Sequence, residues 1–253
     1  MLFSPKDKTT AVGMHTPTYF ILLAIYLILI IVSIFLSRKM QHKTVKKVII
    51  GSTIFVWVTE FIKMLFYGLT YGIEKVEFIP LYYCSMFMYA TILANFKNEP
   101  LKRAGLSFIS FGGILGAVAF FCFPSAVIPN YHLWHYMTFR TMIFHSLMIY
   151  VGLLILITGY YKPKGKDFLN YAVFFLITFV LAYTLNNVNG TNLMYISKPL
   201  KIELSKMLYD ANPNLYPFIF GSLNMLAPYG ISYGFYWLIQ KKLTKNTNIR
   251  TEE

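Results

Sequence analysis

The stretch TYFILLAIYLILIIVSIFLS, residues 18–37, is 20 residues long and has no charged side chain. A membrane-spanning helix needs about 20 consecutive apolar residues, so this stretch predicts one. It is too long for the apolar core of a signal peptide, and no small-residue cleavage site accompanies it. We therefore expect it to stay in the protein as a membrane anchor.

The rest of the chain is just as apolar. Of the 253 residues, 57% are hydrophobic and 13% are charged, whereas soluble domains have about 25% charged residues. Because backbone polar groups must be paired in lipid, and no apolar stretch alternates like a barrel strand, each stretch should be a helix. We predict an all-α polytopic membrane protein whose seven-transmembrane-helix bundle fills residues 17–239, between a polar segment 1–16 and a basic tail 240–253. The seven predicted spans are 18–37, 48–71, 79–96, 104–123, 139–160, 168–187 and 215–239.

The lysines and arginines are divided unevenly between the two ends of these helices. Fifteen of the 23 lie in the first, third and fifth loops and in the tail, seven lie on the opposite side, and Lys63 lies within a span. The positive-inside rule predicts an outside N-terminus and a cytoplasmic C-terminus, as in a multi-pass protein of the cell membrane. A nucleic-acid partner is not expected, because no soluble domain is present to carry a basic face.

Several polar residues are predicted to meet near the outer leaflet. Cys84 and His145 each lie about five residues from the outer end of a predicted helix, about 7–9 Å below the surface. Asn186 and Asn192 come at the outer end of the sixth span. As a base, His145 could activate the thiol for acyl transfer. Alternatively, His145 bonds a neighbouring carbonyl, and Cys84 is a packing residue or half of a disulfide with Cys122.

Three charged residues lie within the predicted spans. Glu60 and Lys63 are three residues apart on one helical face, the spacing of an intramembrane ion pair. Glu60 could instead orient His145 as the third member of a triad, although the helix rise predicts that it lies about 6 Å deeper. Arg140 could bind a lipid phosphate or serve as an interfacial anchor.

Other features indicate architecture. Gly112 and Gly116 have the small-xxx-small spacing that lets helices pack closely. The outer loop PSAVIPNYHLWHYMTFR, residues 124–140, has the aromatic composition of a segment at headgroup depth. Its His132 and His135 have no cysteine or acidic companions nearby, so we expect no metal site, and no nucleotide-binding motif is present.

The order and spacing of five elements resemble a known family, the YwaF-type bacterial integral membrane proteins, whose eukaryotic relative is transmembrane protein 164. The resemblance covers about residues 48–235. It is carried by Glu60 and by four segments, IPLYYCSMFMY, FGGILGAVAFFCFP, FRTMIFHSLMIYVGLL and NNVNGTNLMYISKP. These are similar to the family's L-P-L-H-L-C segment, its glycine-rich fourth span, its F-x-x-H segment and its N-Y-M-F-L-x-x-x-P segment.

The resemblance implies an acyltransferase that moves a fatty acyl chain between phospholipids through an acyl-cysteine, assisted by a histidine. This chain departs from the motif at two positions. Tyr82 stands where the bacterial motif has a histidine, and Leu81 directly follows the proline, where the eukaryotic relatives have their nucleophile. The residues that match the family site by position are Cys84, His145, Asn186 and Asn192.

We therefore predict a membrane-embedded lipid acyltransferase or acyl hydrolase. Cys84, deprotonated by His145, would attack an ester carbonyl of a phospholipid in the outer leaflet, and the amide of Asn186 or Asn192 would stabilise the oxyanion. Such chemistry needs no cofactor.

Tyr82 and Arg140 are further candidates for substrate contacts in this prediction, and Glu60 and Lys63 for a supporting role. The alternative function is a transporter or substrate-binding membrane subunit, in which the asparagines and the two charged residues of the second span bind a small solute. No oligomeric state follows from the sequence.

Overall fold

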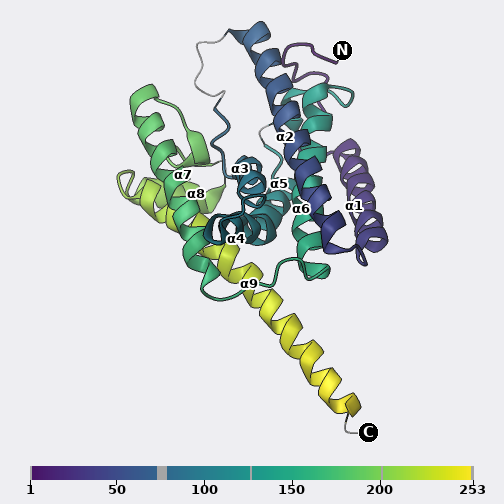
Figure 1. Ribbon diagram of the computed structural model, residues 1–253. Helices are drawn as coiled ribbons and strands as arrows, with labels where there is room; N and C mark the ends of the chain where they lie inside the picture. The colour runs from purple at the N-terminus through teal and green to yellow at the C-terminus, as the bar shows by residue number, and fades with distance from the viewer. Residues whose placement is uncertain (1, 73–78, 126, 201, 252–253) are drawn as a thin grey trace.

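The computed structural model describes residues 2–72, 79–125, 127–200 and 202–251, and side chains as far as Lys242. This part of the chain is all-helical and contains no strand (Figure 1). The α-helices are α1 (Pro17–Ser37), α2 (His42–Tyr71), α3 (Met86–Leu93), α4 (Glu99–Ser107), α5 (Ile114–Cys122), α6 (Tyr136–Ile157), α7 (Asp167–Asn189), α8 (Glu203–Ala211) and α9 (Tyr216–Thr251). Shorter turns are a π-helix at Phe108–Gly113 and 3-10 turns at Ile128–Asn130 and Leu193–Tyr195.

Among the described residues, five helical stretches are long and apolar enough to cross a membrane: α1, α2, the continuous stretch from α4 to α5, α6 and α7. They confirm five of the predicted spans to within a few residues. The last predicted span falls in α9, which is 36 residues long but is not one of these five. The chain is therefore a multi-pass membrane protein by the length and composition of its helices.

The third predicted span, 79–96, is wrong as a spanning helix. It contains only α3, which has eight residues and is therefore about 12 Å long, against a hydrocarbon core of about 30 Å. Residues 79–85 before it are not helical. Irregular backbone is tolerated at membrane depth only where protein surrounds it, and residues 80–85 are buried or partly buried. α3 itself is enclosed by protein. Its fully buried residues are Met86, Phe87, Met88, Ala90 and Thr91.

The close approach of α4 explains how α3 is enclosed. Gly105 on α4 lies so near to α3 that a Cβ atom there would come 2.4 Å from the carbonyl oxygen of Ala90 and 2.5 Å from the backbone nitrogen of Ala94. Any larger side chain would collide with backbone, so glycine is required at this crossing. α4 then continues into α5 through the π-helix, which has one residue more per turn than an α-helix.

The N-terminal segment closes one end of the bundle. We call residues 2–15 the N-terminal strap, because their backbone bonds the loop between α5 and α6 at several points. The bonds run from the Asp7 nitrogen to the Asn130 oxygen, from the Val12 nitrogen to the Tyr131 oxygen, and from the Tyr136 nitrogen to the Leu2 oxygen, each at 2.9–3.0 Å. The ammonium of Lys6 lies over the rings of Tyr67 and Tyr71 at the end of α2.

His135 joins this strap to α6. Its Nδ1 accepts a hydrogen bond from the Met137 nitrogen at 3.0 Å, and its Nε2 donates to the carbonyl oxygen of Ser4 at 3.0 Å. The two contacts define a neutral imidazole with its proton on Nε2. Burial lowers the pKa of His135 below its ordinary 6.5, since the charged form would be desolvated and would lose the Nδ1 acceptor.

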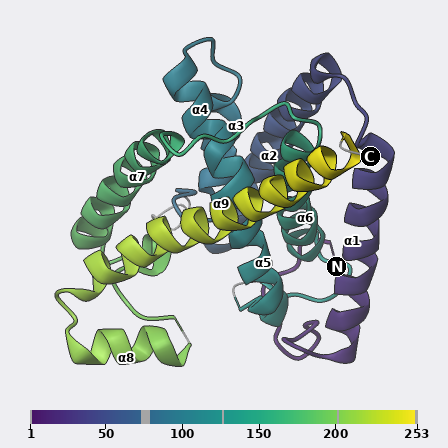
Figure 2. The ribbon, with the colours of Figure 1, turned by 90° about the horizontal axis from the view of Figure 1, so that it is seen from below.

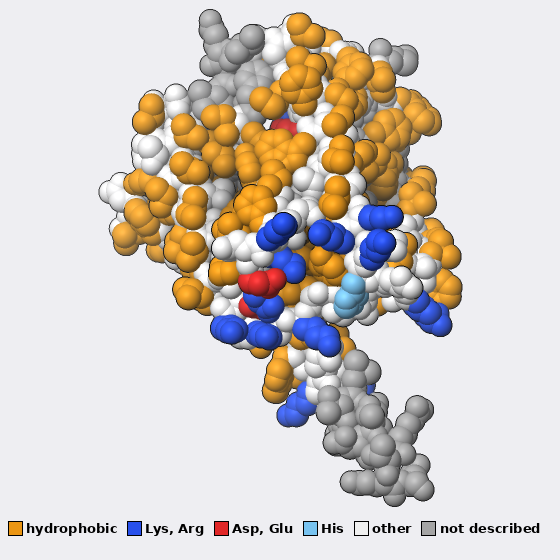
Figure 3. Space-filling view, in the orientation of Figure 1, with side chains coloured by type: hydrophobic (Ala, Val, Ile, Leu, Met, Phe, Trp, Pro, Cys, Tyr) orange, Lys and Arg blue, Asp and Glu red, His pale blue; other side chains and the backbone are white. Residues whose placement is uncertain are grey.

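The charged side chains are separated from the apolar surface. Figure 3 shows a broad hydrophobic surface over the upper part of the molecule and a group of lysines and arginines below it. The lysine-rich loop between α1 and α2 and the loop between α6 and α7 lie at this lower end (Figure 1). This separation is the pattern from which the positive-inside rule predicts orientation.

The last two helices lie beside the main bundle. α8 forms an arm at one end, and α9 passes under the other helices (Figure 2). Leu204 and Met207 of α8 are 63% and 61% exposed, and Ser205 is buried, bonding Tyr216 at the start of α9. The long predicted connection 189–214 thus contains an amphipathic helix, which suits a segment lying at the membrane surface.

Candidate active site on the broken third segment

Cys84 lies in the non-helical residues 79–85, two positions before α3 begins. Its thiol is free and partly buried, and Sγ donates a weak hydrogen bond to the carbonyl oxygen of Gly116 on α5 at 3.7 Å. No backbone carbonyl among the described residues accepts from the nitrogens of Cys84 and Ser85. The start of α3 therefore presents free N–H donors beside the thiol, as helix N-termini do.

The glycines of α5 and the π-helix make room for this segment. A Cβ atom at Gly112 would lie 2.9 Å from the hydroxyl oxygen of Tyr83, and one at Gly116 would lie 3.0 Å from its ring. The hydroxyl of Tyr83 also lies 3.3 Å from that of Tyr171 on α7. The small-xxx-small pair thus accommodates an aromatic ring, which fixes the residue directly before Cys84.

His145 is buried on α6, and its hydrogen bonds define its tautomer. Nδ1 lies 2.7 Å from the carbonyl oxygen of Thr141, one turn earlier. A carbonyl oxygen can only accept, so the proton is on Nδ1 and Nε2 carries the lone pair. No described residue bonds Nε2. The ring stacks on Phe120 of α5, with centroids 3.7 Å apart and an interplanar angle of 10°.

α5 relates the thiol to the imidazole. Gly116, which contacts Cys84, and Phe120, which stacks on His145, are four residues apart and so lie on one face of the helix, about 6 Å apart along its axis. Met148, one turn beyond His145, also faces Gly116. The structure therefore brings both predicted residues to the same face of α5, but no hydrogen bond joins them among the described contacts.

The two predicted asparagines hold the loop after α7. Asn186 donates from Nδ2 to the Leu193 carbonyl at 3.0 Å, and its Oδ1 accepts from the Leu193 nitrogen at 2.7 Å. Asn192 donates to the Lys198 carbonyl at 3.1 Å. Both amide groups are therefore already used within the loop. To stabilise an oxyanion, either would have to give up one of these bonds.

Tyr82 connects this loop to the cysteine segment. Its ring lies 5.3 Å from that of Tyr195, centroid to centroid. Met194 and Tyr195 have φ angles of 54° and 56°, in the left-handed region that side chains other than glycine rarely adopt. Such strain persists only where surrounding contacts enforce it, and here Asn186 supplies them by bonding both polar backbone groups of Leu193.

Glu60 forms the ion pair that the sequence predicts, and a second one that it does not. Lys63 contacts Glu60 Oε1, and Arg140 of α6 contacts Oε2. We call these three residues the Glu60 cluster. The alternative role, in which Glu60 orients His145, has no described contact to support it, because the carboxylate is held by the two cations and His145 Nδ1 is held by Thr141.

The predicted depth of Glu60 is wrong, for a geometric reason. The hydroxyl of Tyr136, the first residue of α6, donates to the Thr59 carbonyl at 2.6 Å, so α2 continues for about three turns beyond the start of α6. One face of those turns contacts the N-terminal strap through Phe3 and Lys6, while Phe61 and Leu69 stay exposed. Glu60 therefore lies level with the start of α6, and His145 lies more than two turns further along that helix.

Comparison with known sequences identifies the family. The sequence model of the TMEM164 family matches residues 12–231. This chain belongs to the TMEM164 family. No curated protein and no solved structure matches the chain.

The range shared with the TMEM164 family includes the whole candidate site. It begins within the N-terminal strap and ends within α9, so it covers α3, α5 and α6 with Cys84 and His145. Membership confirms the relation to transmembrane protein 164 that the motifs predicted, and it is compatible with a membrane protein that acts on lipids.

Two features of this TMEM164-family chain were considered in the sequence but take no part in the site. Cys122 is a free, exposed thiol, so Cys84 is not in a disulfide. His132 and His135 make local hydrogen bonds, and the described residues contain no group of three metal ligands.

The sequence reasoning missed Thr141 and the contact between Arg140 and Glu60. The contact between Arg140 and Glu60 joins two helices and leaves no local signal, whereas Thr141 lies one turn before His145, so its i, i+4 spacing was visible in the sequence. Pro80 did offer a signal for the broken third segment, because proline lacks a backbone donor and disfavours helix in the residue before it.

Proposed function

We propose that this TMEM164-family protein is a membrane-embedded lipid acyltransferase or acyl hydrolase, in which Cys84 is the nucleophile and His145 is the base. The tautomer of His145 carries the proposal. Because Nδ1 donates to the Thr141 carbonyl, Nε2 has a free lone pair and faces no described partner. A neutral imidazole held in this way is suited to accept a thiol proton.

The first half-reaction forms a thioester. The thiol of Cys84 releases its bond to the Gly116 carbonyl and gives its proton to His145 Nε2, directly or through one water molecule. The sulfur attacks an ester carbonyl of a phospholipid, and the carbonyl π electrons move to oxygen. When the tetrahedral intermediate collapses, the lysophospholipid alkoxide leaves and takes the proton from His145.

The oxyanion is best stabilised by the start of α3. The backbone N–H groups of Cys84 and Ser85 have no described carbonyl acceptor, and they lie at the positive end of a helix. The amides of Asn186 and Asn192 are engaged in the loop, so their role in this proposal is to fix Tyr195 against Tyr82.

The second half-reaction returns the enzyme to its starting state. A hydroxyl of a lysophospholipid, or of water in a hydrolase, gives its proton to His145 and attacks the thioester. The acyl group moves to the acceptor oxygen, and the sulfur recovers the proton. Phospholipids are the proposed partners and no cofactor enters either half. The proposed relation to YwaF-type bacterial proteins and the placement in the cell membrane belong to this same proposal.

The alternative is a transporter or substrate-binding subunit for a small solute. It is favoured by the Glu60 cluster, because buried charges often mark solute sites in membrane proteins, and by the broken third segment, which transporters also have. The two functions make opposite demands on Cys84, since transport does not need a reactive thiol.

The test is intact-mass spectrometry of the purified protein after incubation with phospholipid. We expect a fatty-acyl adduct on the wild type that hydroxylamine removes. Cys84→Ala should show no adduct, and His145→Ala should form it much more slowly. Cys122→Ala is the matched control, since it removes the other thiol and should keep the adduct. An adduct that persists in Cys84→Ala, or none on folded wild type with a free thiol, would refute the proposal.

A further inference from the structure

The Glu60 cluster contains more positive than negative charge. Its one carboxylate faces the ammonium of Lys63 and the guanidinium of Arg140, which gives a formal charge of +1. Among the described residues, no second carboxylate contacts either cation. The side chains of Glu60, Arg140 and Lys63 are 2%, 9% and 17% exposed. A charge that is this far removed from water and has no counter-ion costs free energy.

The cluster also has more hydrogen-bond donors than acceptors. A guanidinium and an ammonium have about eight N–H bonds between them, whereas one carboxylate offers about four acceptor positions. Among the described residues, Arg140 Nε is buried and has no hydrogen-bond partner, and Glu60 Oε1 has only its ion pair with Lys63. The nearby hydroxyl of Tyr136 donates to the Thr59 carbonyl and is not among the described partners of Arg140 Nε. The geometry is therefore that of a site lacking an anion.

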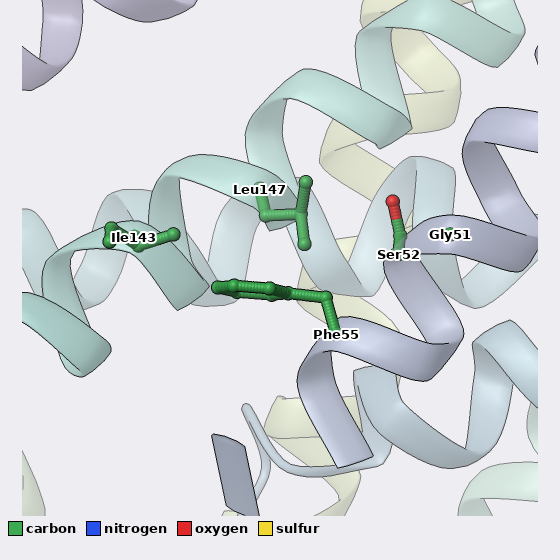
Figure 4. A pocket seen from close by; sticks show the side chains of 5 residues that line it. All are labelled: Gly51, Ser52, Phe55, Ile143 and Leu147. Carbon is green, nitrogen blue, oxygen red and sulfur yellow. The ribbon is translucent and has the colours of Figure 1, made fainter. Parts of the chain in front are cut away.

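An apolar groove begins one turn away on the same two helices. It is lined by Gly51, Ser52 and Phe55 of α2 and by Ile143 and Leu147 of α6. Figure 4 shows the ring of Phe55 reaching from α2 toward the two side chains of α6. Gly51 leaves the groove open, since a Cβ atom there would meet nothing within 4 Å.

The groove faces the surface that lipid covers. Phe55 and Ile143 are each 38% exposed, and around them α2 shows other exposed apolar side chains, which are Ile54, Val58 and Phe61. An anion that reaches the cluster from this side must therefore carry an apolar body. A free inorganic anion has none, whereas a phospholipid combines a phosphate diester with acyl chains.

We propose that the Glu60 cluster and the groove between α2 and α6 form a phospholipid-binding site. The phosphate diester accepts hydrogen bonds from Arg140 and Lys63 and balances their surplus charge, while Glu60 fixes both cations. One acyl chain lies along Gly51 and Phe55 toward Leu147. This site does not depend on acyl transfer at Cys84, and it would exist in a protein without enzymatic activity.

The test measures lipid binding to the full-length protein in detergent by native mass spectrometry. The probes are phosphatidylglycerol, a diacylglycerol with the same acyl chains, and inorganic phosphate. Phosphatidylglycerol should bind at least about tenfold more tightly than diacylglycerol, because only it offers the charge-assisted bonds. Arg140→Gln and Gly51→Leu should each weaken phosphatidylglycerol binding about tenfold or more, the first by removing a donor and the second by filling the groove.

Three control variants distinguish binding at this site from lipid binding elsewhere on the protein. Lys102→Gln removes a cation far from the groove and should leave binding unchanged. Cys84→Ala should also bind like the wild type, so failure of acyl transfer and failure of this site are distinguishable. Gly51→Leu leaves every charge in place, so it still decides the question if Arg140→Gln does not fold.

Equal binding of phosphatidylglycerol and diacylglycerol would overturn the site. So would wild-type affinity in folded Gly51→Leu. If inorganic phosphate displaced the lipid as effectively as a second phospholipid did, the cluster would be a simple anion site, and the role of the groove would be refuted.

Discussion

The described part of the chain holds two buried ion clusters at opposite ends of the membrane domain, and they are built differently. In one, which we call the Asp167 cluster, the carboxylate at the start of α7 accepts from Arg103 Nε and Nη2 at 2.5 Å each, from the Tyr161 hydroxyl at 2.8 Å and from the Lys164 nitrogen at 2.9 Å. One cation faces one anion, and the remaining acceptor positions are filled. In the Glu60 cluster two cations share one carboxylate.

This difference in charge balance distinguishes a structural contact, the Asp167 cluster, from a proposed binding site, the Glu60 cluster. The Asp167 cluster joins α4 to α7 and closes the loop before α7, so it stabilises the packing of these helices. The Glu60 cluster joins α2 to α6, but it does so with a charge and a buried N–H left over. Buried polar groups that are only partly satisfied are unfavourable for stability, which is why they tend to mark function.

The largest expected effect tests the balanced cluster. Arg103→Met should lower the free energy of unfolding by about 3–5 kcal/mol, because it leaves the fully buried carboxylate of Asp167 without a counter-charge. Thermal or denaturant unfolding in detergent measures this. Lys102→Met is the control, since Lys102 pairs with an exposed Glu99 and such pairs contribute about 0–1 kcal/mol. Equal losses in the two variants would contradict the comparison.

A smaller effect is expected in the unbalanced cluster. Arg140→Met removes the surplus charge and leaves Lys63 paired with Glu60, so the free energy of unfolding should fall by only about 1 kcal/mol or less. The same unfolding measurement on lipid-free protein provides the value. A loss as large as that of Arg103→Met would mean that Arg140 holds the fold as Arg103 does, and the contrast between the two clusters would disappear.

The smallest expected effect is a pH dependence of strap docking, and the group that titrates is His135, which bonds the strap. Burial lowers the pKa of His135 below its ordinary 6.5 while the strap is docked. As pH falls below 6.5, His135 therefore takes up a proton more readily when the strap is undocked, and docking weakens. Above pH 6.5 docking does not depend on this group. Limited proteolysis of residues 2–15 at about pH 7.5 and about pH 5.5 should show faster cleavage at the lower pH.

His135→Gln should remove this pH dependence, because it has no titrating ring. His42→Gln is the control: His42 bonds the Thr158 carbonyl at the other end of the bundle, and the strap should respond to pH as in the wild type. Equal cleavage of the wild type at both pH values would count against the prediction.

The sequence predicted five long apolar helices, including the stretch from α4 to α5 that is mostly buried in protein, and it was wrong about residues 79–96. α1 and α7 are exposed to lipid along much of their length, so composition alone defines them. Residues 79–96 have the same composition for another reason, since α3 is surrounded by protein. Hydropathy cannot distinguish burial in protein from burial in lipid, and the position of Gly105 against Ala90 is a tertiary fact.

The candidate site was predicted unevenly for a similar reason. Residue type and depth were enough to select Cys84 and His145, and the ion pair of Glu60 with Lys63 followed from helical spacing. The sequence could not predict the role of a residue whose bonding partner is brought close only by the fold. Asn186 was selected for its amide, yet what that amide bonds is decided by how the chain turns back at Leu193.

The π-helix at Phe108–Gly113 determines in which direction the side chains of α5 point relative to those of α4. If the same six residues adopted α-helical geometry instead, they would turn further by about one residue's rotation, and α5 would be rotated by about 100° relative to α4. Gly116 would then turn away from Tyr83 and Cys84, and Phe120 away from His145. The amino-acid composition would be unchanged, so hydropathy would not reveal this rotation, and it would still take the site apart.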